Sequence, residues 1–207
     1  MKSKKIYAMF QKKDVLKLWN KLYDDNGETK IAMQYLSDGT AVYPLENLPL
    51  FDTLTIKGLL EVDPDDKLDC FLDAVPKWFE TVLADYDDSD VPLTETANMF
   101  GYTVIETFHN NKDDNFPELC FFVDPKYLAP LSNEKYDLFS RKVRITKTAV
   151  RVIVAKAGLI LKAVIMPYTF NVSDCNKNFE TAEKVYCVLR DLRDAYKSRE
   201  SEDEIKL

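Results

Sequence analysis

Glycine is scarce in this chain of 207 residues: its five glycines lie far apart, at positions 27, 39, 58, 101 and 158. Neither GxGxxG nor GxxxxGK occurs in the sequence. The glycine-rich loops that cradle nucleotide phosphates are therefore absent. This absence argues against dinucleotide-binding enzymes and P-loop enzymes.

Histidine is scarcer still, since His109 is the only one. Many hydrolases and metalloenzymes use histidine as a base or a ligand, and most metal sites use more than one. No serine lies in a GxSxG nucleophile elbow. The four cysteines lack CxxC spacing, so we predict reduced, mostly buried thiols and neither a zinc site nor a redox pair. We therefore expect a protein that is not an enzyme and uses no cofactor.

Long apolar runs are also missing. The best candidate, residues 150–166, carries three basic side chains, whereas a membrane helix needs about 20 predominantly apolar residues. The basic start of the chain is followed by polar residues at positions 11–13, so we expect no secretory signal. These features predict a cytoplasmic protein that does not contact membranes. Lysine outnumbers arginine 22 to 6, as in the AT-rich genomes of many viruses.

Hydrophobic residues make up 46% of the chain, enough for a packed core. In the first half, a short strand is predicted over Ile6–Phe10. Apolar side chains at helical spacing predict an amphipathic helix from Asp14 through Tyr23. The same spacing returns over 68–86, where Pro76 predicts a kink or a division into two helices. Ser37-Asp38-Gly39-Thr40 indicates a hairpin turn between two strands.

Asp52 predicts the cap of a short helix that runs to Leu60. In the second half, β-branched and aromatic residues predict strands, over residues 102–108, 119–123, 143–155 and 159–166. Asn178 is then expected to cap a final amphipathic helix. Helices and hairpins are mixed without regular βαβ alternation, so the predicted class is α+β. We expect one domain over 1–199, with a possible boundary between lobes near 87–93, and a frayed acidic tail over 200–207.

Charge is strongly segregated along the chain. Residues 61–140 contain five lysines against nineteen aspartates and glutamates, whereas 141–207 contain fourteen basic residues against nine acidic ones. The predicted partner-binding acids are Asp63, Asp65, Asp66, Asp69, Asp85, Asp87, Asp88 and Asp90. The predicted partner-binding bases are Arg141, Lys142, Arg144, Lys147, Arg151, Lys156 and Lys162. The sequence leaves open whether the two groups pair within one molecule.

Several interpretations of this segregation remain open. The charges can neutralise one another inside the fold, or they can hold copies of the chain together head to tail. The acidic segment can bind a basic protein, or act as an inhibitor by imitating a row of phosphates. Alternatively, the bases of 141–162 form a β-ribbon that binds nucleic acid. Against this last interpretation, odd and even positions share the bases, which divides them between the two faces of a strand.

A magnesium-dependent nuclease is a minor alternative. It would require Asp65, Asp66 or Asp124 to converge in a cleft, because two-metal chemistry needs clustered carboxylates. The acidic segment that starts at Asp85 fails the pattern of a calcium loop, because it lacks glycine at the sixth position and glutamate at the twelfth. The sequence therefore favours a non-enzymatic module that binds proteins for assembly or inhibition, with another protein or a copy of itself as partner.

Overall fold

The computed structural model describes residues 10, 15–60, 69–99, 101–107, 120–132, 135–145 and 148–168. The chain divides into two compact units, one made of 1–93 with 123–167 and the other of 94–122 with 168–207. The predicted strand over 6–10, apart from Phe10, lies outside the described residues. So do the predicted helix that starts at Asn178 and the predicted tail over 200–207.

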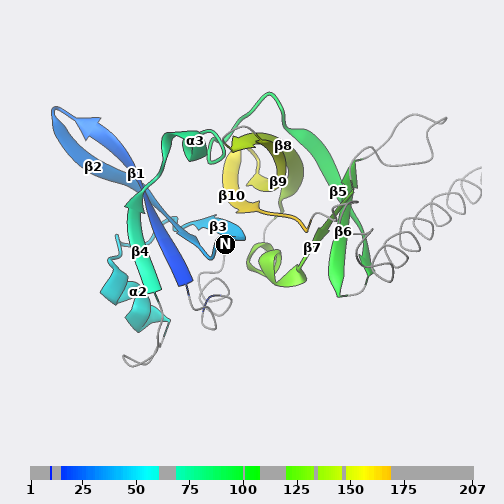
Figure 1. Ribbon diagram of the computed structural model, residues 1–207, viewed down its shortest axis with the longest axis horizontal. Coiled ribbons are helices and arrows are strands. Elements are labelled where there is room, and N and C mark those ends of the chain that lie inside the picture. Colours follow the sequence, from blue (N-terminus) through cyan, green and yellow to red (C-terminus); the bar gives the residue numbers. More distant parts are fainter. Residues whose placement is uncertain are drawn as a thin grey trace, which may run out of the picture. The chain divides into compact units, whose positions relative to one another are not determined.

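The first unit is built on a sheet of mixed direction, in the hydrogen-bonded order β4-β1-β2-β3-β10-β9-β8-β5 (Figure 1). Its strands are β1 (Val15–Asp25), β2 (Glu28–Ser37), β3 (Ala41–Pro44), β4 (Asp69–Ala74), β8 (Asp137–Ile145), β9 (Thr148–Ala157), β10 (Ile160–Ile165) and the start of β5 (Val91–Met99). β4 runs parallel to β1, whereas β1–β2, β2–β3, β3–β10, β10–β9, β9–β8 and β8–β5 are antiparallel pairs. Strands far apart in sequence therefore share one sheet.

Short helices accompany this sheet. α2 (Thr53–Leu59) lies against β4, and α3 (Lys77–Glu80) follows β4 directly (Figure 1). Two single 3₁₀ turns, Pro125–Tyr127 and Ala129–Leu131, precede β8. One core cluster of this unit, named here the valine cluster, has members from β2, β3, β8, β9, β10 and the segment around α3.

The second unit contains most of β5, together with β6 (Tyr102–Thr107) and β7 (Cys120–Val123) up to Phe122. The three strands are hydrogen-bonded in that order. Val104 and Phe122 are buried here, and Tyr102 packs on them. The ring of Tyr102 also meets that of Tyr168 edge-on, with centroids 5.1 Å apart.

The α+β prediction is wrong: the described chain is rich in strands, and its helices have seven residues or fewer. The largest error is the helix predicted over 14–23, because residues from Val15 onward form β1. Leu16 and Leu18 are fully buried, while Trp19 belongs to the opposite face of the strand and is partly buried there. Because the partly buried Trp19 adds an apolar residue on the second face, the series also fits helical spacing, and only the pairing with β2 and β4 reveals the strand.

The helical interpretation of 68–75 is also wrong, since residues 69–74 form β4 at the edge of this sheet. Most of its side chains are exposed, so burial does not impose the alternation that identifies a strand. Pro76 does mark a boundary, because it is the residue immediately before α3. A strand rather than a helix precedes it.

Predictions that rest on a few neighbouring residues agree with the structure. The hairpin prediction is confirmed, with Gly39 at φ +85° in the turn between β2 and β3. The cap prediction is confirmed as well, since an oxygen of Asp52 accepts hydrogen bonds from the Thr55 backbone N–H and hydroxyl, each at 2.7 Å. The strands predicted at 102–108 and 119–123 correspond to β6 and β7.

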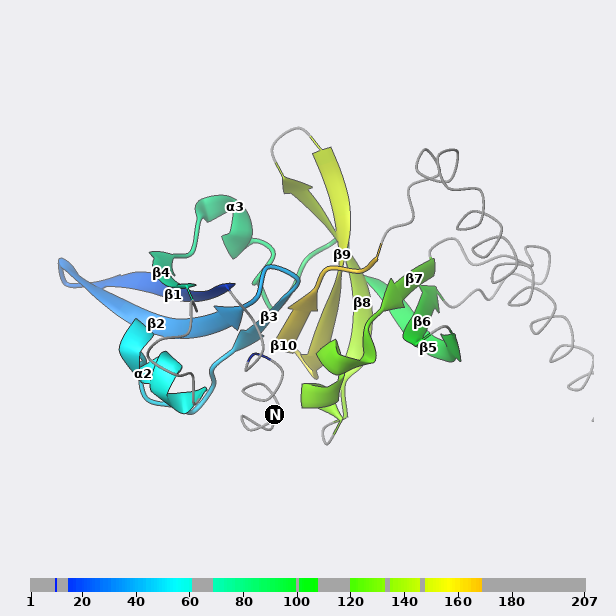
Figure 2. The same cartoon turned by 60° about the horizontal axis from the view of Figure 1, so that its bottom comes forward.

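The strand predicted over 143–155 is in fact parts of two strands, because β8 ends at Ile145 and β9 starts at Thr148. The connection at 146–147 contains none of the residues typical of turns, so the sequence gives no sign of it. Figure 2 shows β8 and β9 as a long twisted pair. Among the described helices, none has the length and apolarity that would take it across a bilayer.

Candidate functional site: an ion cluster, a basic face and an apolar pocket

Three charged side chains form a buried ion cluster, defined here as Asp90, Arg141 and Lys156. The Arg141 Nε and Nη2 atoms donate to the two carboxylate oxygens of Asp90, each at 2.7 Å. Lys156 Nζ donates to Asp90 Oδ2 at 2.6 Å. The exposed fraction of each side chain is 7% or less. The acidic loop and the basic ribbon therefore meet inside one molecule at this point.

Arg141 also binds the backbone that follows α3. Its Nη1 atom donates to the carbonyl oxygens of Val82 at 2.8 Å and Ala84 at 2.6 Å. The side chain of Arg141 is fully buried, so carbonyl groups complete the hydrogen bonding that the carboxylate begins. The Lys156 ammonium lies 4.8 Å from the centre of the Phe139 ring. These contacts fix the loop after α3 to β8 and β9.

Two opposing effects act on the pKa of Asp90. Burial alone would raise it, but the hydrogen bonds and positive charges of Arg141 and Lys156 outweigh burial and hold it below the ordinary value of 3.8. Asp90 is therefore ionised at neutral pH. The cluster is a paired and hydrogen-bonded set of charges, which makes it a structural element of the fold.

The remaining bases of the β8–β9 pair lie on the opposite face. Lys142 pairs across the strands with Arg151, and Arg144 pairs with Ala149. Directly opposed residues in an antiparallel pair point to the same side of the sheet, so Lys142, Arg144 and Arg151 share one surface, named here the basic face. Lys142 and Arg144 are exposed, and Arg151 is partly exposed with its Nη1 atom 3.1 Å from the Ser140 hydroxyl.

The basic face lies on a two-stranded segment. β10 pairs with β9 as far as Ile153, and β5 pairs with β8 as far as Ser140. Among the described residues, no further strand pairs with 141–145 or 148–152, which we name the ribbon tip. Val143, Val150 and Val152 on its other face pack into the valine cluster, next to the buried Arg141. The ribbon tip thus has a buried inner face and a basic outer face.

Most other predicted binding residues make contacts within the same molecule. The Asp85 carboxylate accepts the Leu161 N–H at 2.9 Å, and Lys162 Nζ lies 2.6 Å from Glu46. In the acidic loop, Asp87 accepts the Ser89 N–H, and Asp88 accepts the Tyr86 hydroxyl at 2.9 Å. The side chain of Asp69 is exposed on β4. The predicted residues that lie outside the described part of the chain are Asp63, Asp65, Asp66 and Lys147, together with His109.

The carboxylates of the nuclease hypothesis can be compared only in part. Asp124 is the described member, and it accepts the Lys126 N–H at 3.0 Å as the cap of a 3₁₀ turn. Its carboxylate also forms an ion pair with the Lys126 ammonium at 2.5 Å. Within the described ranges, no group of three or more metal-ligating side chains is found. Asp124 therefore has a local structural role.

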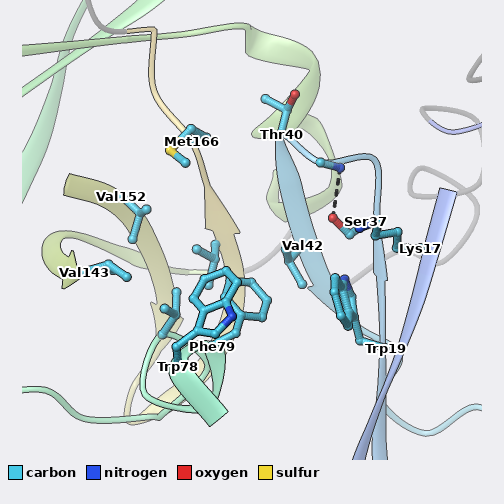
Figure 3. A pocket seen from close by; sticks show the side chains of 13 residues that line it. Lys17, Trp19, Ser37, Thr40, Val42, Trp78, Phe79, Val143, Val152 and Met166 are labelled. Atoms are coloured by element: carbon cyan, nitrogen blue, oxygen red, sulfur yellow. Dashed lines mark hydrogen bonds between the residues drawn. The ribbon is translucent and has the colours of Figure 1, made fainter. Parts of the chain in front are cut away.

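An apolar pocket of about 280 Å³ opens in the first unit beside the valine cluster. Buried valines of β3, β8, β9 and β10 form its floor, and Lys17, Thr40, Trp78 and Met166 at its rim are partly or fully exposed. Figure 3 shows Trp19 from β1 facing Trp78 and Phe79 from α3 across this space. Trp19 and Phe79 are in ring contact, with centroids 6.0 Å apart.

The sequence gives no sign of this pocket. The aromatic residues that line it fall in two separate predicted helices, and no local pattern brings β1 and α3 together. Both tryptophans of the chain line the pocket. That pair was a possible signal, but tryptophan is common in protein cores and indicates no ligand by itself.

No protein-family model, no curated protein and no solved structure matches this chain. The described residues define a strand-rich protein with a buried ion cluster, a basic face on a ribbon tip and an apolar pocket. Any function must therefore be inferred from these three features.

Proposed function

We propose that the protein is a non-enzymatic module that binds an acidic protein surface through its basic face. One observation carries the proposal: the strand register gathers Lys142, Arg144 and Arg151 on one exposed face, while Arg141 and Lys156 are buried with Asp90. No acidic residue occurs between Asp137 and Asp174 in the sequence, so the ribbon itself does not neutralise the basic face. The face is available for an external anion.

A second copy of the chain fits this requirement. The net charge of −7 makes two copies repel each other at long range, but the 35 acidic residues of a second copy offer local partners for the basic face. Asp69 and Asp73 on the edge strand β4 are exposed examples of such acids. A basic face and acidic residues at different places on one protomer favour head-to-tail contact. The attraction is screened by salt.

Self-association is therefore expected to be salt-dependent. The charge reversal Lys142→Glu with Arg144→Glu should weaken association at about 50 mM salt by about tenfold or more, or about 1.4 kcal/mol. Sedimentation over a range of protein concentrations, at about 50 mM and about 500 mM salt, measures the effect. A matched control is Lys21→Glu with Lys135→Glu, which reverses two exposed lysines elsewhere in the same unit.

The control pair should associate as the wild type does. A wild-type protein that stays monomeric at high concentration and low salt would remove self-association. Equal loss in both charge-reversed pairs would show that net charge, and not the basic face, governs the interaction.

Nucleic-acid binding is the second candidate, and the strand register favours it more than the sequence did. Odd and even sequence positions divide the basic residues between the two faces of a single strand. The pairing of β8 with β9 nevertheless brings Lys142, Arg144 and Arg151 to the same face. A two-stranded ribbon can approach a major groove, and each neutralised phosphate contributes about −0.9 to the slope of log affinity against log salt. The net charge of −7 opposes long-range attraction to a polyanion, which ranks this candidate second.

A mobility-shift titration tests this candidate. If the basic face binds duplex DNA, the salt slope should be about −3, for three phosphates. The slope should fall towards zero in the variant with Arg144→Glu and Arg151→Glu. The absence of any shift at low salt, with duplex or single strands, would rule it out.

A further inference from the structure

We propose that the apolar pocket binds a small amphiphilic carboxylate, a molecule with an apolar body and one anionic head. The floor of the pocket consists of buried valines, and three aromatic rings, those of Trp19, Trp78 and Phe79, complete the walls. Such a surface favours an apolar body, because transfer of apolar area out of water is favourable. This inference does not depend on the function proposed for the basic face.

The volume limits the size of the body. An engineered apolar cavity of about 150 Å³ holds a benzene molecule. A pocket of about 280 Å³ therefore takes a body of about eight to ten carbon atoms. The exposed rim then lets a polar head remain in contact with water. These dimensions fit a medium-chain acid better than a full-length lipid chain.

Lys17 favours a negatively charged head group. Its ammonium lies 5.1 Å from the centre of the Trp19 ring, at the rim of the pocket, and its side chain is only partly buried. Among the described residues it makes no ion pair. An unneutralised ammonium beside an apolar wall complements an anionic head whose apolar part fills the pocket.

Asp38, two residues before Thr40 at the rim, is held away from the pocket. Asp38 Oδ1 accepts the backbone N–H groups of Thr40 and Ala41, each at 2.9 Å, and Asp38 Oδ2 accepts the Tyr127 hydroxyl at 3.0 Å. Asp38 is not among the residues that line the pocket. Lys17 is the one charged side chain among the described residues that line the pocket, so an anionic head is favoured over a cationic one.

The tryptophans provide the assay. Since both line the pocket, all tryptophan emission reports on it. We would titrate the full chain with octanoate, 1-octanol and octylamine, which share an eight-carbon chain and do not absorb in the tryptophan range. Octanoate should produce a saturable change and bind about two- to fivefold more tightly than octanol, with octylamine weakest.

Two variants separate the charge from the cavity. Lys17→Met keeps an unbranched apolar side chain and should bring octanoate affinity down to that of octanol, whereas Lys21→Met, on the same strand but outside the pocket lining, should leave the preference intact. Val152→Phe should fill the floor and abolish binding of all three probes. If that variant fails to fold, Thr40→Phe at the partly exposed rim makes the same test.

Several outcomes would overturn the inference: no saturable change, equal affinity for the three probes, or an octanoate preference that survives Lys17→Met. Tryptophan emission that changes with protein concentration in the absence of any probe would instead assign the pocket to a second copy. The variant with Lys142→Glu and Arg144→Glu should still bind octanoate, so failure of the proposed function and failure of this inference are distinguishable.

Discussion

Replacing Asp90 by asparagine is expected to lower the free energy of unfolding by about 3–5 kcal/mol. The substitution keeps the size of the side chain but removes its negative charge. Arg141 and Lys156 would then remain as two buried cations, both directed at a neutral amide. Removing one partner of a buried ion pair is costly because the remaining charge has neither water nor a counter-ion.

Urea denaturation at neutral pH measures this loss. Asp88→Asn in the same acidic loop is the matched control, because Asp88 is exposed and accepts a hydrogen bond from the Tyr86 hydroxyl. The control should change stability by less than about 1 kcal/mol. If the two substitutions had equal small effects, the ion cluster would not stabilise the fold.

Acid should remove the contribution of the Asp90 carboxylate to the free energy of unfolding. The folded-state pKa of Asp90 is lowered, so its stabilising effect is complete above the unfolded-state pKa of about 3.9. It is lost as the pH falls through the lower folded-state pKa. The stability difference between the wild type and Asp90→Asn should therefore be constant near neutral pH and shrink as the pH falls below about 4.

Replacing Gln34 by leucine is expected to lower the free energy of unfolding by about 2–4 kcal/mol, the second large effect. The buried amide of Gln34 accepts the Phe51 N–H at 2.7 Å and donates to the Phe51 carbonyl oxygen at 2.8 Å. Leucine has a similar volume but makes neither bond. Both backbone groups of Phe51 would then stay buried without these partners.

Since this amide holds the chain before α2 against β2, hydrogen exchange in 49–60 should accelerate in Gln34→Leu beyond what the global loss of stability explains. Asn20→Ala is the control, because it removes the partner that accepts from Gln34 at 2.9 Å and leaves the two Phe51 bonds in place. Its cost should be about 1 kcal/mol or less. Unchanged exchange in 49–60 would contradict this role of Gln34.

The charge segregation of the sequence has two structural outcomes within the described residues. Some of the charges pair inside the fold, as in the buried cluster of Asp90, Arg141 and Lys156. Others, such as those of Lys142 and Arg144, are exposed on the ribbon tip. A count of charges along the chain treats these bases alike, although their environments differ completely.

The sequence alone determined the features that neighbouring residues specify. The β2–β3 turn depends on Gly39 and on the hydrogen bonds that the Asp38 carboxylate accepts from the Thr40 and Ala41 N–H groups. α2 depends on its cap at Asp52. Such interactions span two or three residues, so their signal lies within a short window. The approximate positions of β6, β7 and β10 followed from β-branched and aromatic content in the same way.

Tertiary contacts alone determine that β1 and β4 are strands. They also determine the β8–β9 register, the ion cluster and the pocket. Val15 pairs with Asp69, and Arg141 meets Asp90 and the carbonyls after α3, through contacts that join residues more than 50 positions apart. Backbone pairing at that range overrides local periodicity, because it satisfies hydrogen bonds that the strand cannot make within itself. The face on which each base lies depends on the same register, and so does the candidate site.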